Sequence, residues 1–258
     1  MIREIVIDGT AIACWVNDGG FAEGRKSIVF VHGSGGDHTL WEGQYKALQG
    51  EFNVASVNLP GHGLSGGKSE REVMRYVEWV KKTIGALGLR GPVLVGHSLG
   101  AAISMNFAIH EGFLLSAIVP VGGGCEMPVN PSILGKIHTD LPSVISMVVK
   151  FAISKANRDA VGPYLQRGLE KGDPDAFYND LYACDRMSIE AEIGKIAIPA
   201  LVVCGDDDKM TPPDLSRFIA DAIPGAKLAL IEGAGHYVMR EKPEAFNSVL
   251  SAFVRGLP

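Results

Sequence analysis

Short, largely apolar runs alternate with longer amphipathic stretches through most of this chain. Such runs are typical of parallel strands buried on both faces, because helices then cover both sides of the sheet. The amphipathic stretches space their apolar residues as a helix with one buried face does. The pattern therefore predicts a sheet built from βαβ units. The strand-like runs are residues 27–31, 52–59, 92–95, 115–121, 200–204 and 227–231, and the main helical stretches are residues 69–84, 99–110, 213–223 and 243–254.

The first residues follow a different pattern, in which apolar and polar positions alternate. Residues 2–7 and 11–16 predict two strands around a turn signal at residues 8–10, so the chain is expected to open with a hairpin. Farther along, Ser69 and Glu72 have the spacing of a capping box, in which the serine caps the helix and the glutamate reaches back to it. This pair predicts that the helix over residues 69–84 begins at Ser69.

The alternation of strands and helices breaks off after Gly124 and resumes near Ala200. In between, helical patterns dominate, five prolines separate short helices, and no run is typical of a strand. We therefore expect an α/β core made of residues 1–124 and 195–258, and a helical cap insertion made of residues 125–194. The insertion is short and partly very apolar, which favours a cap over the edge of the sheet.

Length and charge limit the classes of protein to which this chain can belong. The chain has 258 residues, 47% of them hydrophobic, which is enough for one large core. It carries 24 Lys and Arg against 29 Asp and Glu, a net charge of −5, without a basic cluster. This balance argues against a nucleic-acid partner and leaves a small molecule as the expected ligand.

The four cysteines show neither close pairing nor the spacing of a metal site. We expect them to be reduced thiols packed in the core, with no bound metal and no cofactor. No apolar run reaches the length of a membrane span, and the first residues lack the apolar run of a signal peptide. These features predict a cytoplasmic protein without stable membrane insertion.

The candidate chemistry centres on Gly96-His97-Ser98-Leu99-Gly100, which lies between a strand-like run and a helical one. This is the Gly-x-Ser-x-Gly pattern of a nucleophile elbow, in which a sharp turn from strand to helix raises the serine at the carboxyl end of the sheet. The flanking glycines avoid clashes in that turn, and the amino terminus of the helix favours negative charge beside Ser98.

A second copy of the pattern shows that the motif alone is not specific. Residues 63–67 also read Gly-x-Ser-x-Gly around Ser65, but glycine and histidine precede them where the elbow needs a strand. Residues 61–66 also fit the Gly-x-Gly-x-x-Gly of a dinucleotide site. The acidic residue that such a site requires would fall inside an amphipathic helix near Trp79, which excludes this interpretation. We expect Ser98 to be the nucleophile.

A serine hydroxyl becomes a nucleophile when a base takes its proton and a third group orients the base. The run 200–204 leads into Asp206, Asp207 and Asp208, and the run 227–231 leads into Gly235-His236. Of the seven histidines, His236 alone follows a strand and precedes a helix, so it is the predicted base. Spacing leaves the choice among the three aspartates open.

With these residues in view, the sequence resembles the α/β-hydrolase family. The resemblance spans nearly the whole chain and rests on His32-Gly33 and on residues 58–65, 96–100, 205–212 and 235–236. It implies the α/β-hydrolase fold, with a mostly parallel eight-stranded sheet flanked by helices and a helical cap. One departure is Asn58, where relatives of this type commonly have aspartate; that position looks structural.

The resemblance also assigns roles to residues. It implies a triad of Ser98, Asp208 and His236, because the family places the acid three residues after the glycine. The nucleophile motif assigns one oxyanion-hole donor to the backbone N–H of Leu99, and the match at His32-Gly33 assigns the second to Ser34.

Within the family, the chain resembles small carboxylesterases and enol-lactone hydrolases that use serine. This implies cleavage of an ester, lactone or thioester of a small, partly apolar acid through an acyl-enzyme. Two alternatives stay open, namely a carbon–carbon bond hydrolase of ring-cleavage diketones and a non-hydrolytic sensor of small ligands. Apolar cap residues either line the substrate pocket or form the core of the cap. These residues are Met127, Ile145, Met147, Val148 and Phe151.

Overall fold

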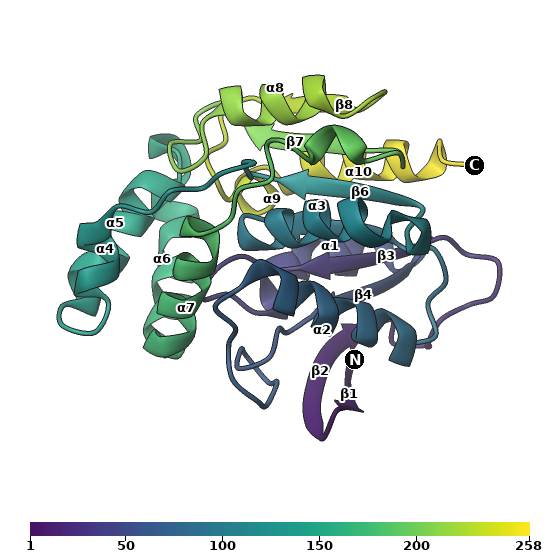
Figure 1. Cartoon of the computed structure of the whole chain (residues 1–258), viewed down its shortest axis with the longest axis horizontal. Helices are drawn as coiled ribbons and strands as arrows, with labels where there is room; N and C mark the ends of the chain where they lie inside the picture. The colour runs from purple at the N-terminus through teal and green to yellow at the C-terminus, as the bar shows by residue number, and fades with distance from the viewer.

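Eight strands form one sheet in the order β1-β2-β4-β3-β5-β6-β7-β8 in the computed structural model, which describes residues 1–258 (Figure 1). The pairs β1–β2 and β2–β4 are antiparallel, and every other pair is parallel. The predicted hairpin and the mostly parallel eight-stranded sheet are therefore confirmed. The strands are β1 (Ile2–Ile7), β2 (Thr10–Val16), β3 (Ser27–Val31), β4 (Asn53–Val57), β5 (Val93–His97), β6 (Ala117–Val121), β7 (Leu201–Gly205) and β8 (Lys227–Ile231).

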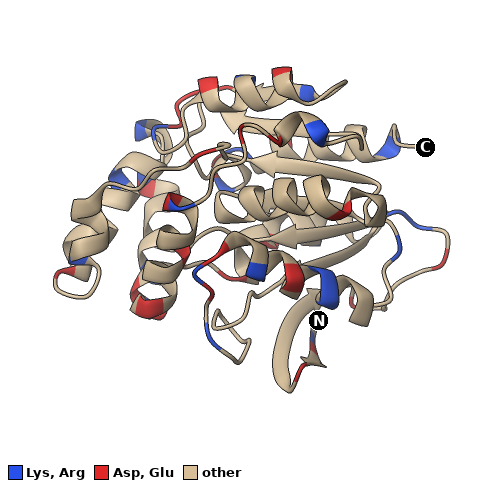
Figure 2. Cartoon of the chain, viewed as in Figure 1, with Lys and Arg blue, Asp and Glu red and all other residues tan.

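Helices cover both faces of this sheet, and alternate strand residues fill two separate apolar clusters. In β3, for example, Val29 and Val31 belong to one cluster and Ile28 and Phe30 to the other, because successive side chains point to opposite faces. The central strands carry no Asp, Glu, Lys or Arg, and the charges lie mainly on helices and loops (Figure 2), the exceptions being Arg3 and Glu4 in β1 and Lys227 in β8. Burial on both faces explains why these strands are apolar throughout.

The first cluster lies under α2 (Val73–Ala86), α3 (Leu99–Glu111) and α8 (Pro213–Ala222). The second lies under α1 (Glu42–Leu48) and α10 (Pro243–Arg255), which extend from the short helices η1 (His38–Trp41) and α9 (Val238–Glu241). None of the helices is both long and apolar enough to cross a membrane.

Between β6 and β7 the regular elements are helices, and Glu126 and Ser188 form one isolated β-bridge. The helices over residues 131–185 lie beyond the carboxyl ends of the parallel strands (Figure 1). They have a small apolar cluster of their own, built from α5, α6 and α7. The division of the chain into core and cap at residues 125 and 194 stays a prediction. The helices of this insertion are α4 (Pro131–Lys136), α5 (Leu141–Ala152), α6 (Arg158–Lys171) and α7 (Pro174–Asp185), with the short turns η3 (Lys155–Asn157) and η4 (Ile193–Lys195) following α5 and α7.

The predicted capping box at Ser69 is wrong. Helix α2 begins at Val73, its N-cap is Glu72, and no side chain caps it. The Ser69 hydroxyl instead accepts a hydrogen bond of 3.0 Å from Asn179 Nδ2 on α7. The local pattern assigned this hydroxyl to the start of α2. In the structure it instead contacts the cap, 110 residues away in the chain.

Candidate active site

Ser98 lies at the turn where β5 passes directly into α3. Its backbone has φ 54° and ψ −111°, and a positive φ occurs at only one other non-glycine residue, Asp8. Strain of this kind costs about 1–3 kcal/mol and persists only where the surroundings impose it. The amide of Ser98 donates to the Val121 carbonyl of β6 at 2.9 Å, which holds the turn against the sheet.

The glycines of the elbow are required by close packing. A Cβ atom at Gly96 would lie 1.9 Å from the carbonyl oxygen of Gly100, and a Cβ atom at Gly100 would lie 2.5 Å from that of Val31. Both obstacles are backbone atoms, which no change of side-chain conformation can move. The turn is therefore possible only with glycine at these two positions.

We expect Gly96→Ala to destabilise the fold by at least about 3 kcal/mol, because the strand and helix must separate to admit the methyl group. Gly85→Ala is the matched control, since Gly85 lies in α2 with nothing within 4 Å of its Cβ position. It should leave stability unchanged or raise it by up to about 1 kcal/mol. Urea unfolding of both variants measures the difference, and equal stabilities would contradict the packing argument.

Asp208 and His236 meet at the carboxyl ends of β7 and β8. His236 Nδ1 donates to Asp208 Oδ2 at 2.8 Å, and both side chains are buried. The amides of Met210 and Thr211 donate to Asp208 Oδ1, and the Thr211 hydroxyl donates to Oδ2. Burial alone would raise the pKa of Asp208, but the charge of His236 and these hydrogen bonds hold it below its usual value.

The other two aspartates of this loop point elsewhere. Asp206 accepts from the amide of Gly233, and Asp207 forms an exposed ion pair with Lys209 at 3.3 Å. Of the three carboxylates that the sequence left open, Asp208 is the one hydrogen-bonded to His236.

His97, next to Ser98, supports the His236 segment. Its ring lies 4.6 Å from the ring of His236, and its Nε2 donates to the His236 carbonyl at 3.0 Å. The His236 amide in turn donates to the carbonyl of Ala152, at the end of cap helix α5, at 2.7 Å. Core and cap therefore both fix the backbone of His236.

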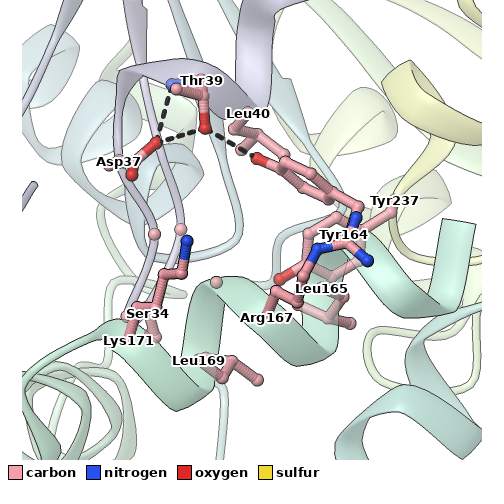
Figure 3. Close-up of a pocket in the computed structure, with 14 residues that line it drawn as sticks. Ser34, Asp37, Thr39, Leu40, Tyr164, Leu165, Arg167, Leu169, Lys171 and Tyr237 are labelled. Carbon is pink, nitrogen blue, oxygen red and sulfur yellow. Dashed lines mark hydrogen bonds between the residues drawn. The ribbon is translucent and has the colours of Figure 1, made fainter.

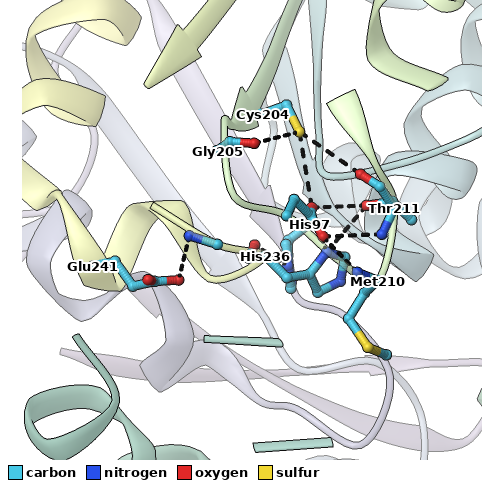
Figure 4. A network of polar contacts seen from close by, with 9 residues as sticks. His97, Cys204, Gly205, Met210, Thr211, His236 and Glu241 are labelled. Atoms are coloured by element: carbon cyan, nitrogen blue, oxygen red, sulfur yellow. Dashed lines mark hydrogen bonds and ion pairs between the residues drawn. The ribbon is translucent and has the colours of Figure 1, made fainter. Parts of the chain in front are cut away.

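Glu241 is a buried residue of this region that sequence reasoning missed. One of its oxygens accepts from the amide of Gly235, directly before His236 (Figure 4). The other accepts from the Ser154 amide and from Asn157 Nδ2, both in the cap. Glu241 thus connects the loop of His236 to the segment that follows α5. These partners lie far apart in the chain, so no spacing pattern reveals them.

Ser98 and His236 both line a cavity of about 460 Å³ between the sheet and the cap. This volume suits a small molecule. The cap contributes apolar side chains from α5 and α7, including Val148 and Leu181, and Met127 from the segment after β6. The cavity is therefore lined mostly by apolar side chains, with Ser98 and His236 among its polar residues.

Of the five residues predicted either to line the pocket or to form the core of the cap, two lie in the cavity lining and three lie elsewhere. Met127 and Val148 line the cavity, but Ile145, Met147 and Phe151 do not. Ile145 packs inside the cap, and Phe151 is 43% exposed. Helix α5 is apolar on nearly all sides, so its sequence left open which face it turns inward; Met147 and Phe151, four residues apart, share another face.

The two predicted oxyanion donors lie beside Ser98. Leu99 is the first residue of α3, where amides have no acceptor within the helix. Ser34 follows β3 and lines the cavity, and neither its amide nor its buried hydroxyl donates within the protein. A Cβ atom on Gly33 would lie 2.8 Å from His97 Nδ1 and 3.1 Å from the Cβ atom of Ser98, so this loop passes close to the elbow.

A second cavity of about 290 Å³ shares Ser34 and Tyr237 with the first (Figure 3). Its lining is more polar. Asp37 accepts from the amide and hydroxyl of Thr39, and that hydroxyl lies 3.2 Å from the Tyr164 hydroxyl. Ser34 therefore stands between an apolar cavity and a polar one.

Comparison with known proteins, by sequence and by structure, matches this chain to hydrolases. The sequence model of the alpha/beta hydrolase family matches residues 28–249. The 2-hydroxy-6-oxononadienedioate/2-hydroxy-6-oxononatrienedioate hydrolase of Burkholderia vietnamiensis is 27% identical, over 98% of this chain and 94% of its own. The putative carbamate hydrolase RutD of a Caulobacter species is 25% identical, over 92% of this chain and 94% of its own.

Two solved structures extend this comparison. The enol-lactonase of Burkholderia xenovorans matches with a TM-score of 0.91 at 20% identity, covering 98% of this chain and all of that one. A thermophilic esterase matches with a TM-score of 0.86 at 28% identity, covering 100% of this chain and 99% of that one. Both are similar to this chain over its whole length.

Proposed function

The chain belongs to the alpha/beta hydrolase family, and from that premise we propose that it is a serine hydrolase. It cleaves an ester, lactone or thioester of a small, partly apolar acid through an acyl-enzyme. The observation that carries the proposal is the buried pair of Asp208 and His236, 2.8 Å apart, of which His236 lines the same apolar cavity as Ser98.

The proposed mechanism uses each side chain in one role. Ser98 Oγ attacks the carbonyl carbon, and His236 Nε2 takes the proton and passes it to the leaving group. Asp208 accepts from Nδ1, so the neutral ring keeps Nε2 free as the base. The amides of Leu99 and Ser34 stabilise the oxyanion, each contributing about 100- to 1,000-fold. Water then hydrolyses the acyl-enzyme, with His236 again acting as the base.

The two cavities support the choice of substrate class. An ester or thioester has a group on each side of its carbonyl, and Ser34, a proposed oxyanion donor, lies where the two cavities meet. The larger, apolar cavity suits the acyl group. The smaller one, with Asp37 and Thr39, suits a polar leaving group.

We expect Val148→Phe to shorten the acyl chain that the enzyme accepts, since Val148 lines the apolar cavity. The ratio of kcat/KM for p-nitrophenyl octanoate to that for the acetate should fall about tenfold or more. Met147→Phe is the matched control, one residue away and outside the cavity lining, and should leave the ratio unchanged. Equal chain-length profiles in both variants would remove Val148 from the acyl pocket.

A carbon–carbon bond hydrolase is the second candidate. It is favoured by the 27% identity to the hydrolase from Burkholderia vietnamiensis, whose name gives 2-hydroxy-6-oxononadienedioate as a substrate. The same serine, histidine and aspartate would act in it, so the triad does not separate the two candidates. The two candidates differ in their substrates, so turnover of each substrate class distinguishes them.

The test combines a covalent probe with a substrate panel. A fluorophosphonate should inactivate the protein by forming one adduct, which peptide mass spectrometry should locate on Ser98 and not on Ser65. Turnover of short p-nitrophenyl esters and acyl thioesters supports the proposal. Turnover of vinylogous diketones with little ester activity transfers the assignment to the second candidate. An adduct without turnover of any panel member contradicts both.

A further inference from the structure

A second buried carboxylate, Asp180 on cap helix α7, lies outside the proposed triad and accepts three hydrogen bonds. Its Oδ2 accepts from the amide of Gly35 and from His62 Nε2, each at 2.9 Å. Its Oδ1 accepts from the hydroxyl of Tyr76 on α2. The Asp180 side chain is fully buried, so its charge must be compensated by these partners.

The first of these donors belongs to the loop that carries Ser34. Gly35 has φ +64°, and a Cβ atom there would lie 2.9 Å from the side chain of Leu169 and 3.0 Å from that of Phe177. The cap therefore packs directly on this loop, and Asp180 binds it by hydrogen bond at the residue after Ser34. The peptide plane between Ser34 and Gly35 is fixed from the cap.

The hydrogen bonds around His62 require a charged ring. Its Nδ1 lies 3.0 Å from the carbonyl of Pro60, and its Nε2 faces the Asp180 carboxylate. Both partners are acceptors only, so both ring nitrogens must carry protons. Burial alone would lower the pKa of His62, but the charge and hydrogen bond of Asp180 outweigh it and raise that pKa above the ordinary value of 6.5.

The ring of the neighbouring His32 lies 5.0 Å away and, unlike that of His62, is neutral. Its Nδ1 donates to the carbonyl of Gly33 at 2.8 Å, and its Nε2 accepts from the amide of Leu59 at 3.1 Å, which fixes a neutral ring. Burial and the nearby charge of His62 lower the pKa of His32 to about 4. The positive charge of this buried site is thus confined to His62.

We propose that Asp180 is a positioning residue, which holds the Gly35 amide so that the adjacent Ser34 amide stays directed at the oxyanion, with His62 as its charged partner. This inference rests on the proposed serine mechanism. The hydrogen bond at Gly35 limits rotation about Ser34, and a displacement of about 1 Å at a catalytic group costs about 100-fold in rate. The cap therefore contributes to rate as well as to binding.

Asp180→Asn tests this role. Asparagine keeps the size but loses the charge, and its NH₂ end must face one of the three donors. We expect kcat on a p-nitrophenyl ester to fall at least about tenfold while KM changes less than about threefold. Inhibition by phenylboronic acid, whose tetrahedral adduct places an oxygen where the oxyanion forms, should weaken by a similar factor.

Asn17→Ala controls for a general loss of stability. Asn17 is a buried residue of the hairpin side of the sheet, where it donates to the carbonyls of Gln49 and Phe52. The variant should lower Tm as Asp180→Asn does, yet keep kcat within about twofold of the wild type. If the two variants have the same kcat at similar Tm, Asp180 is only structural and the proposal is overturned.

The pH dependence supplies a readout that is independent of turnover. Because the pKa of folded His62 is raised, the stabilisation from the pair is complete below 6.5 and is lost as pH rises through the raised value. The Tm difference between wild type and Asp180→Asn should therefore shrink with rising pH. The titratable groups that face His62 are His32 after β3, Tyr76 on α2, and Asp173 and Asp180 at the start and middle of α7.

His62→Gln provides a second variant in case Asp180→Asn does not fold. Glutamine can still donate to Asp180 but carries no charge, so the alkaline loss of Tm should disappear while kcat stays within about threefold. Persistence of that loss would show that His62 is not the titrating partner. If Ser98→Ala retains wild-type turnover, the proposed function fails on its own, and the Tm series still reports on the ion pair.

Discussion

Ser98→Ala is expected to lower kcat for ester hydrolysis by about a million-fold. The variant keeps the cavity and the amides of Leu99 and Ser34 but has no atom that can attack the carbonyl, and members of a triad act as one unit. The positive φ at residue 98 will suit alanine no worse than serine, so the protein should fold. Steady-state hydrolysis of p-nitrophenyl butyrate and loss of fluorophosphonate labelling measure the effect.

Ser65→Ala is the matched control, because it alters the serine of the second Gly-x-Ser-x-Gly sequence. The Ser65 hydroxyl accepts from the amide of Ala13 at 3.0 Å and donates to the Asn58 carbonyl at 2.8 Å, so its role is to join a turn to the sheet. The variant should lose about 1–3 kcal/mol of stability and keep its kcat. Loss of activity in Ser65→Ala with full activity in Ser98→Ala would exchange the two assignments.

Asp208→Asn is expected to lower kcat by about 10,000-fold, the second largest effect. Asparagine would present an NH₂ group or a weaker acceptor to His236 Nδ1, so the ring loses the tautomer that keeps Nε2 basic. The one oxygen of asparagine can accept either from the amides of Met210 and Thr211, which hold the loop, or from His236 Nδ1, but not from both sides at once. Stopped assays over long times, with active-site titration to exclude contaminating wild type, measure so slow a rate.

Asp207→Asn is the control for that variant. Asp207 is the adjacent carboxylate, 42% exposed in an ion pair with Lys209, and it has no contact with His236. Its replacement should change kcat by less than about twofold, since exposed ion pairs contribute little. A comparable loss in Asp207→Asn would mean that the loop as a whole, and not the acid at 208, sustains the rate.

Periodicity and motif spacing predicted the parts of this protein that depend on neighbours along the chain. Two-sided burial makes strands such as β3 and β6 apolar throughout, so their positions follow from composition alone. The elbow at Ser98 is local in its sequence motif, and Gly96 avoids a clash with the Gly100 carbonyl four residues on, whereas Gly100 avoids the Val31 carbonyl of the neighbouring strand β3. The resemblance to a known family was needed to choose Asp208 over its two neighbours, to assign Ser34 as an oxyanion donor and to suggest a substrate class.

The parts that escaped prediction depend on distant partners. Asp180 and His62 are 118 residues apart, and nothing in either local sequence shows that both are buried in one ion pair. Ser69 matched a capping box but binds the cap instead. The inward face of α5, which its sequence left open, is set by how the cap rests on the sheet. Such features require the assembled fold.

Glu241 sets a condition for exchanging caps between relatives. A chimera that replaced residues 125–194 as one block would discard the two cap donors of this carboxylate, at Ser154 and Asn157, while keeping Glu241 itself. The graft would then bury a negative charge with the Gly235 amide as its remaining partner, beside His236. A hybrid that retains residues 152–157 of the recipient keeps the hydrogen-bond partners of Glu241. The cap of a relative is therefore best introduced as two segments, one before and one after residues 152–157.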